Sequence, residues 1–248
     1  MITQNILSVA FGHLVGDFLR ILQAVAHRQV RLLWGGQVLS AVGDEIYNIA
    51  LVFFAAQLIG LNAGYVSAVQ AASGFGFSLI GGIWADHRDP QRIMIYADLI
   101  RGLAVLSLPL LTIFLPLSLW MLIPVAVVVS GLSAFFSPAL GAFLPQAISD
   151  RNLLQASNGL METTGRIARI IGPGLIGLLS KYIPLIHYFT VDAISFFASA
   201  WSISKLKKTQ LQGNLEKSPL PIWESLLAGH RLAVIDPIIE FVIFSGVI

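Results

Sequence analysis

Long apolar runs alternate with short polar stretches along this chain. Residues 65–85 carry no charged side chain, and residues 93–116 carry only Asp98 and Arg101. Because a helix needs roughly 20 apolar residues to cross the hydrocarbon of a bilayer, these runs predict membrane-spanning helices. The predicted helices cover residues 32–59, 63–85, 90–115, 118–143, 152–181 and 184–205. The pattern therefore indicates an all-α membrane protein in which residues 31–205 form a six-helix transmembrane bundle.

The segments on either side of this bundle have a different pattern. Residues 1–30 place apolar side chains at helical spacing, and their first arginine is Arg20, which favours an interfacial amphipathic helix over a cleaved signal peptide. Residues 206–235 are the extended hydrophilic stretch of the chain and are predicted to be a cytoplasmic linker with a short amphipathic helix. Residues 236–248 are apolar but too short to cross a bilayer, so we predict the start of a seventh helix that is cut off.

Composition supports a membrane protein. Charged residues make up 11% of the chain and the mean hydropathy is +0.80, whereas soluble domains contain roughly 25% charged residues. The net charge is only +2, and the basic residues are spread along the chain without forming a basic patch. No nucleic-acid partner is therefore expected. The chain has no cysteine and its five histidines are scattered, so the sequence predicts no disulfide, no metal site and no cofactor.

Basic side chains predict the orientation, because cytoplasmic loops of membrane proteins carry an excess of lysine and arginine. The basic residues predicted on one side are Arg20, Arg28, Arg31, Arg88, Arg92, Arg151, Lys205, Lys207, Lys208, Lys217 and Arg231. Lys181 alone is predicted on the other side. The sequence therefore predicts a multi-pass protein of the cell membrane with a cytoplasmic N-terminus and both ends of the bundle in the cytoplasm.

The polar stretch GGIWADHRDPQR, residues 81–92, interrupts two apolar runs. Its charges and its turn must lie in water, because lipid satisfies neither ionised side chains nor free backbone groups. Asp89 followed by Pro90 is typical of a helix N-cap and the first helical position. The stretch is therefore predicted to be the turn of a two-helix hairpin.

The same residues carry a resemblance to a known family. Positions Gly82, Ala85, Asp86, Arg88 and Arg92, followed by Asp98 and Arg101, resemble the loop between the second and third helices of the major facilitator superfamily, Gly-x-Leu-Ala-Asp-Arg-x-Gly-Arg-Arg/Lys. Trp84, His87 and Asp89 depart from that pattern in a way that is similar to the branch of macrolide-efflux proteins and enterobactin exporters. The resemblance implies a gating loop formed by Gly82, Asp86, Arg88 and Arg92, braced by Asp98 and Arg101. The alternative is a polar turn with no gating role.

The resemblance also implies an architecture. In this superfamily two six-helix halves, joined by a cytoplasmic linker, enclose the substrate between them. The resemblance covers residues 31–248, so this chain would supply one half of a major facilitator fold. The partners it implies are the lipid bilayer, protons, a small-molecule substrate, and a C-terminal half or a second copy.

A glycine and proline motif lies in the predicted helix 152–181. Its sequence, GRIARIIGPGLIG, resembles the antiporter signature of the superfamily, Gly-x-x-x-Gly-Pro-x-x-Gly-Gly, at Gly172, Pro173 and Gly177. Proline removes a backbone donor and glycine removes side-chain bulk, so such a helix packs closely and bends. The motif favours export over uptake. The alternative is an ordinary packed helix with a proline kink.

Five ionisable residues are predicted to lie at membrane depth: Asp44, Glu45, Glu162, Arg166 and Arg169. Each charge there costs roughly 2.5 to 3.5 kcal/mol on insertion scales, so a partner or a task is expected. Glu162 and Arg166 are spaced to pair on one helix, which leaves Arg169 to a carboxylate from Asp44 or Glu45. We expect these residues to form a proton-coupling cluster, with a static salt-bridge network as the alternative.

The resemblance implies a secondary active transporter that exports a small amphipathic or hydrophobic compound, such as a drug or a siderophore, in exchange for protons. The alternative is a truncated, non-transporting fragment, or a half-transporter that needs a partner half. An enzyme is not expected, because the sequence lacks intramembrane protease and hydrolase signatures and a phosphate-binding loop. No catalytic residue is therefore assigned. Asp192 lies in the last predicted helix of the bundle and receives no role from the sequence.

Overall fold

The computed structural model describes residues 25–207, except for the side chains of Leu79 and residues 82–87. The described elements are α2 (Arg28–Ile59), the 3₁₀ turn η1 (Gly60–Ala63), α3 (Gly64–His87), α4 (Pro90–Leu111), α5 (Leu119–Ala147), α6 (Arg151–Leu179) and α7 (His187–Ser204). No strand occurs in this part of the chain, so the all-α prediction is confirmed for these residues. Most of the predicted extension, the linker and the seventh helix lie outside the described residues.

Two helices are longer than the apolar pattern predicted. α2 begins at Arg28, a turn earlier than expected, and its side chains Val30 and Leu33 are only 1% and 2% exposed. α5 continues to Ala147, past the predicted end at residue 143, and Leu144 is 2% exposed. Packing against neighbouring helices therefore extends both helices beyond the stretch that lipid alone would require.

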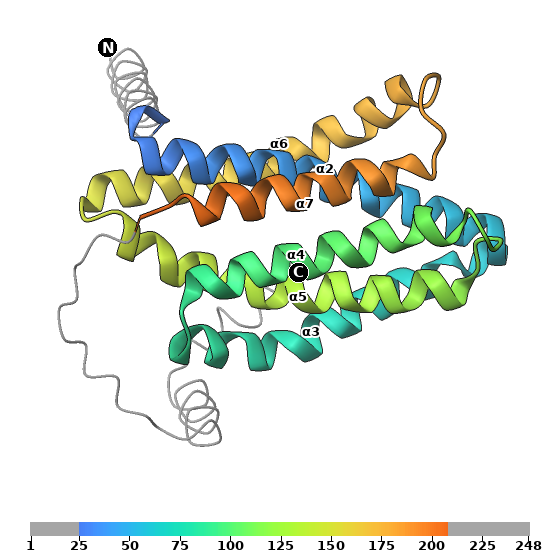
Figure 1. Cartoon of the computed structure of the whole chain (residues 1–248), viewed down its shortest axis with the longest axis horizontal. Helices are drawn as coiled ribbons and strands as arrows, with labels where there is room; N and C mark the ends of the chain where they lie inside the picture. Colours follow the sequence, from blue (N-terminus) through green and yellow to red (C-terminus); the bar gives the residue numbers. More distant parts are fainter. Residues whose placement is uncertain (1–24, 208–248) are drawn as a thin grey trace, which may run out of the picture. The chain divides into compact units, whose positions relative to one another are not determined.

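The helices pack in an order that differs from their order along the chain. Across the bundle the neighbours are α6, α2, α7, α4, α5 and α3 (Figure 1). α7 therefore lies between α2 and α4, and α3 and α6 lie at the two ends of the series. Buried side chains gather where α2, α4, α5 and α7 meet. This arrangement brings polar residues of α2, α4 and α7 to the middle of the bundle.

Small residues allow the close contact between α2 and α7. A Cβ atom added to Gly43 would lie 2.6 Å from Asp192 Oδ1, and one added to Gly36 would lie 3.2 Å from the Ser199 Cα atom. The Ser202 hydroxyl donates to the Leu32 carbonyl oxygen of α2. Small residues at helix interfaces allow such approach in membrane proteins, so this seam fixes α7 against α2.

Carboxylates cap two helices at their N-termini. Asp89 accepts a hydrogen bond from Gln91 N at 3.1 Å, with Pro90 in the first turn of α4. Asp150 accepts from Asn152 N at 2.7 Å and from Leu153 N at 3.0 Å. The predicted cap at Asp89 is therefore confirmed, and it sets the start of α4 after the polar turn.

By length and apolar composition, three helical stretches in the described part of the chain can cross a membrane: Arg28–Ser78, Pro90–Leu111 and Leu119–Ala147. α6 is more polar because it carries Glu162, Arg166 and Arg169, and α7 buries Asp192 and several serines within the bundle. A count of six membrane spans therefore stays a prediction from the apolar pattern.

Large apolar side chains also cover much of the surface. Phe75, Phe114 and Trp120 are 72%, 84% and 90% exposed. Soluble monomers rarely expose extended apolar surface, which marks contact with a membrane or another protein. The surface is thus consistent with lipid around the bundle.

Candidate functional site

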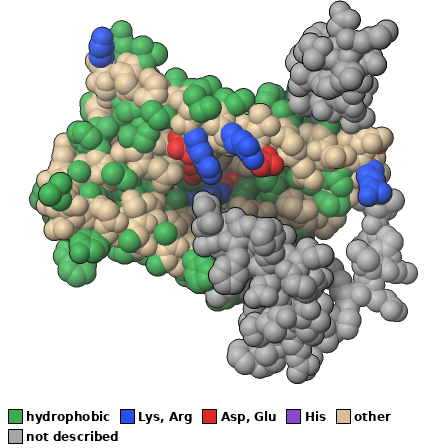
Figure 2. Space-filling view, turned by 180° about the vertical axis from the view of Figure 1, so that it is seen from behind, with side chains coloured by type: hydrophobic (Ala, Val, Ile, Leu, Met, Phe, Trp, Pro, Cys, Tyr) green, Lys and Arg blue, Asp and Glu red, His purple; other side chains and the backbone are tan. Residues whose placement is uncertain are grey.

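Charged side chains of α6 lie on its exposed surface. Arg166 Nη2 is 2.6 Å from Glu162 Oε1, one turn earlier, and both side chains are exposed. Arg169 Nε lies 3.8 Å from Glu45 Oε1 of α2. The Arg169 side chain is 77% exposed, whereas that of Glu45 is 24% exposed. Figure 2 shows acidic and basic side chains side by side midway along one face of the molecule, next to a hollow.

The sequence left the partner of Arg169 open between Asp44 and Glu45. In the structure the carboxylate that faces Arg169 belongs to Glu45. Asp44 is half-buried and interacts electrostatically with Arg101, Asp98 and Glu45 instead. The five charged residues predicted as one cluster are thus divided between an exposed group on α6 and α2 and the interior of the bundle.

The glycine and proline motif lies where α6 meets α2. A Cβ atom added to Gly172 would lie 2.7 Å from Glu45 Cβ, so the missing side chain lets α6 approach α2 at that residue. Pro173 lies inside α6. A Cβ atom added to Gly177 would meet nothing within 4 Å. Of these two glycines, Gly172 is therefore the one that packs against Glu45, whereas Gly177 has no close neighbour in the described structure.

Hydrogen bonds also hold α6 in place. Trp34 Nε1 of α2 donates to Thr164 Oγ1 of α6 at 2.8 Å. The Tyr188 hydroxyl of α7 donates to the Ile176 carbonyl oxygen at 3.2 Å. These contacts lie on either side of Arg169 along α6. The exposed ion pairs therefore sit on a helix that is fixed at two other points.

A second group of charged residues lies inside the bundle. Asp98 and Arg101 of α4 form an ion pair and are 0% and 3% exposed, and Asp192 of α7 is 0% exposed. Arg101 Nη1 donates to Ser133 Oγ of α5 at 3.0 Å. Its guanidinium also lies 4.4 Å from the ring centre of Phe196. This group joins α4, α5 and α7.

The sequence predicted that Asp98 and Arg101 brace the gating loop, and it gave no role for Asp192. The contacts described for Asp98 and Arg101 are instead with each other and with side chains of α5 and α7. The available signal was the polar stripe of α7, in which Asp192, Ser195, Ser199 and Ser202 recur at helical spacing and are buried. A row of polar side chains on one face of an otherwise apolar helix indicates that this face lies inside the bundle, among other polar groups.

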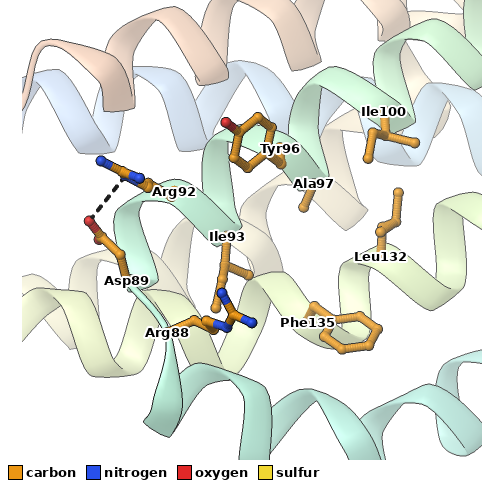
Figure 3. A pocket seen from close by; sticks show the side chains of 9 residues that line it. All are labelled: Arg88, Asp89, Arg92, Ile93, Tyr96, Ala97, Ile100, Leu132 and Phe135. Atoms are coloured by element: carbon orange, nitrogen blue, oxygen red, sulfur yellow. Dashed lines mark ion pairs between the residues drawn. The ribbon is translucent and has the colours of Figure 1, made fainter.

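The predicted gating loop joins α3 to α4 beside an open cavity of about 540 Å³ between α4 and α5 (Figure 3). Arg92 Nε is 3.7 Å from Asp89 Oδ2. In Figure 3, Arg88 lies beside Ile93 at the cavity. The other side chains that line it are Tyr96, Ala97, Ile100, Leu132 and Phe135. Basic groups are thus placed next to an apolar cavity.

Close packing also occurs just before this loop. A Cβ atom added to Gly81 would lie 2.5 Å from the Ala134 carbonyl oxygen, so α3 approaches α5 at this glycine. The side chain of Asp86 and the surroundings of Gly82 lie outside the part of the structure that is described. Their roles in the loop stay predictions.

No group of three or more histidine, cysteine, aspartate or glutamate side chains within residues 25–207 is arranged to hold a metal ion. The described site thus consists of an exposed ion pair within α6, an ion pair that joins α6 to α2, a buried charged group, and a cavity at the α3–α4 loop.

The sequence as a whole identifies the family. Residues 21–248 match the family model described as transmembrane secretion effector, which is one of the major facilitator families. The chain belongs to the major facilitator superfamily. This agrees with the resemblance of the α3–α4 loop and of the α6 motif. The major facilitator chain is therefore a multi-pass membrane protein of a transporter family, not of an enzyme family.

Several curated relatives of this major facilitator chain are efflux proteins by name. Macrolide efflux protein A of Streptococcus pyogenes is 25% identical over 183 residues, which cover 72% of this chain and 44% of the relative. Multidrug efflux pump Tap of Mycolicibacterium fortuitum is 27% identical over 197 residues, which cover 77% of this chain and 47% of the relative. The chain spans less than half the length of these relatives.

Proposed function

We propose that this chain forms one half of a proton-coupled major facilitator transporter that exports a small amphipathic or hydrophobic compound. The observation that carries the proposal is the Arg169–Glu45 pair, which joins α6 to α2 next to Gly172 and leaves the Arg169 side chain largely exposed. An exposed charge is costly in lipid, so this surface faces water or protein. The names of the relatives, macrolide and multidrug efflux proteins, support a drug as the exported class, ahead of a siderophore.

The exposed charges on α6 suggest where the second half lies. In this superfamily the substrate is bound near the middle of the membrane, between two halves. We propose that the surface bearing Arg166 and Arg169 faces this space, opposite a second six-helix half. A C-terminal half or another copy would supply it, and the chain alone would insert without transporting. The partial coverage of the relatives supports this requirement.

The same contact supports the proposed proton coupling. A proton that binds Glu45 removes the attraction for Arg169, and a proton that leaves restores it. Because the pair joins α6 to α2, its strength favours one arrangement of these helices over another, and a bound proton shifts the balance between them. Glu162 and Arg166 lie on the same face of α6 and adjust the local charge, and Asp44, adjacent to Glu45, connects this pair to the charged interior.

We further propose that the α3–α4 loop acts as a gate on the cytoplasmic side. Asp89 caps α4 and approaches Arg92, while Arg88 lies at the cavity between α4 and α5. Movement of α3 against α4 would move Arg88 relative to this cavity. An Asp86→Asn variant that transports at the normal rate would leave the loop as a turn only.

The decisive experiment measures drug efflux from vesicles that hold the complete transporter under an imposed proton gradient. Arg169→Ala and Glu45→Gln are each expected to abolish the dependence of efflux on the gradient, because each removes the pair that a proton controls. Lys181→Gln, which changes an exposed residue outside the cluster, serves as the matched control. If both cluster variants respond to the gradient as the unmodified protein does, the proposed coupling role is wrong.

A further inference from the structure

Three carboxylates share a single guanidinium inside the described bundle. Asp98 and Arg101 come from α4, Asp192 from α7 and Asp44 from α2. These three helices lie side by side, with α7 in the middle (Figure 1). Asp44 and Asp192 interact electrostatically with each other and with both members of the α4 pair. If all four groups were ionised, the site would carry an excess of negative charge in the interior.

Arg101 is already engaged by partners other than Asp44 and Asp192. Its Nη2 contacts Asp98 Oδ1, and its Nη1 donates to Ser133 Oγ at 3.0 Å. The guanidinium also lies 4.4 Å and 4.9 Å from the ring centres of Phe196 and Phe136. Arg101 therefore pairs with a single carboxylate, that of Asp98. It does not neutralise the negative charges of Asp44 and Asp192.

Several polar atoms of this group lack a hydrogen-bond partner in the described structure. They are Asp98 Oδ2, Asp192 Oδ2, Arg101 Nε and the Tyr47 hydroxyl oxygen. Asp192 Oδ1, in contrast, lies 3.2 Å from the Ser195 hydroxyl. Buried polar atoms are nearly always hydrogen-bonded in folded proteins, and a buried charge without compensation is costly. Asp98 is paired with Arg101, whereas the free Oδ2 oxygen of Asp192 has no cationic partner of its own and therefore points to a positively charged ligand.

The packing limits the size of that ligand. The α2 backbone approaches Asp192 so closely that a methyl group at Gly43 would lie 2.6 Å from Asp192 Oδ1 and 2.9 Å from Ser195 Cβ. Within residues 25–207, no three carboxylate or imidazole groups are arranged to hold a metal ion. Metal ions such as Ca²⁺ need about six to eight oxygen ligands. A proton needs one oxygen and almost no space.

We infer that the buried group of Asp44, Asp98, Arg101 and Asp192 is a proton-binding site, in which Asp192 is the carboxylate that takes up and releases the proton. The proton leaves a hydronium ion and adds to a free oxygen of Asp192, which gives a neutral carboxylic acid and one water molecule. Release reverses this step. The inference rests on the proposed function for its role in transport, but proton binding itself does not depend on transport.

The groups that face Asp192 explain how a proton would alter the bundle. α2 supplies Asp44 and the phenol of Tyr47, and α4 supplies Asp98 and Arg101. Glu45 lies next to Asp44 and interacts with it. With the proton bound, α7 presents a neutral group to α2 and α4. When the proton leaves, Asp192 repels Asp44 across the α2–α7 contact, which favours separation of these two helices.

Infrared difference spectroscopy of the full chain in lipid vesicles tests proton binding directly. Between low and high pH, the unmodified protein is expected to lose a carboxylic acid C=O band that Asp192→Asn does not show. Asp150→Asn is the matched control, because this exposed cap accepts its hydrogen bonds equally well as an asparagine. Asp44→Asn, tested in the same way, is expected to retain the band at a shifted frequency. If Asp192→Asn and the unmodified chain give the same pH difference spectrum, the inference is wrong.

Transport provides a second, separate measurement. In vesicles holding the complete transporter, Asp192→Asn is expected to reduce the stimulation of drug efflux by a proton gradient roughly tenfold, within the range of coupling between sites. Failure of the unmodified protein to export drug would contradict the proposed function and leave the infrared result standing. Normal gradient stimulation in a correctly inserted Asp192→Asn protein would instead contradict the role of this site.

Discussion

At the scale of single residues, two of the close helix contacts depend on glycines, which have no side chain. Gly172 and Gly43 each stand where a methyl group would collide with the neighbouring helix, at Glu45 and Asp192 respectively. Both neighbours are carboxylates. Small residues therefore bring acidic groups close to another helix in two separate places, at the surface of α6 and inside the bundle.

Gly172→Ala is expected to lower the free energy of unfolding by about 1 to 3 kcal/mol, because the added methyl group overpacks the contact with Glu45. Gly177→Ala is the control on the same helix, since nothing lies within 4 Å of its added methyl group. Replacing a helical glycine by alanine there should stabilise α6 by up to about 1 kcal/mol. Denaturant titration in detergent measures both, and equal effects would contradict the close contact at Gly172.

Arg101→Ala is expected to destabilise the bundle by about 3 to 5 kcal/mol, because it leaves the buried Asp98 carboxylate without compensation. Arg166→Ala breaks a pair whose side chains are 73% and 68% exposed. Exposed pairs contribute about 0 to 1 kcal/mol, so its effect should be small. The same unfolding titration compares the two variants. A loss for Arg101→Ala no greater than for Arg166→Ala would show that the α4 pair is hydrated.

At the scale of elements, α6 combines contacts with α2, exposed charges and an internal proline. It contacts α2 at Trp34 and Glu45, carries exposed charges, and contains Pro173 within its length. Its start is fixed by Asp150, which accepts from two backbone N–H groups of its first turn. A helix that is capped at one end and tied to α2 along its length can carry a change in the Glu45 contact to the rest of the bundle.

Asp150→Ala is expected to reduce the free energy of unfolding by about 1 kcal/mol, because it removes the acceptor for the first-turn N–H groups. Asp150→Asn should retain nearly all of that free energy, since asparagine caps helices equally well. Thermal unfolding followed by tryptophan fluorescence distinguishes them. If alanine and asparagine have the same effect, the cap contributes nothing to stability.

At the scale of the whole molecule, the connections between the described helices alternate between the two ends of the bundle. The turns after α3 and α5 lie at one end, and those after α2, α4 and α6 lie at the other (Figure 1). The distribution of basic residues predicts that the first end is cytoplasmic. Because the chain contains no cysteine, a single introduced cysteine reports its side of the membrane without background.

In intact cells, Lys181→Cys is expected to react with a membrane-impermeant maleimide, because the α6–α7 connection is predicted to lie outside. Arg88→Cys is expected to react only after the cells are opened. Both positions are exposed, so a difference in labelling reports sidedness and not burial. Labelling of Arg88→Cys from outside would reverse the predicted orientation and move the proposed gate to the other side of the membrane.

Much of the fold could be predicted from the sequence, and less of the site. The positions of the helices followed from the apolar runs, and the start of α4 from the cap at Asp89, since both signals are local, whereas packing set the start of α2 and the end of α5. The grouping of Asp98 and Arg101 with the loop failed to anticipate their contacts with Ser133 and Phe196, which lie far along the chain on α5 and α7. Nothing in the local pattern says which face of α4 turns toward α7.

The sequence by itself determined that this protein is helical and lies in a membrane, because the length and hydropathy of each run decide whether lipid or water suits it. It also carried the motifs of the major facilitator superfamily. Only the tertiary structure decided that α7 lies between α2 and α4, that Glu45 and not Asp44 faces Arg169, and that Asp192 joins the buried charges. Such contacts depend on how helices pack and rotate against one another, which is set by the shapes of side chains far apart in the chain.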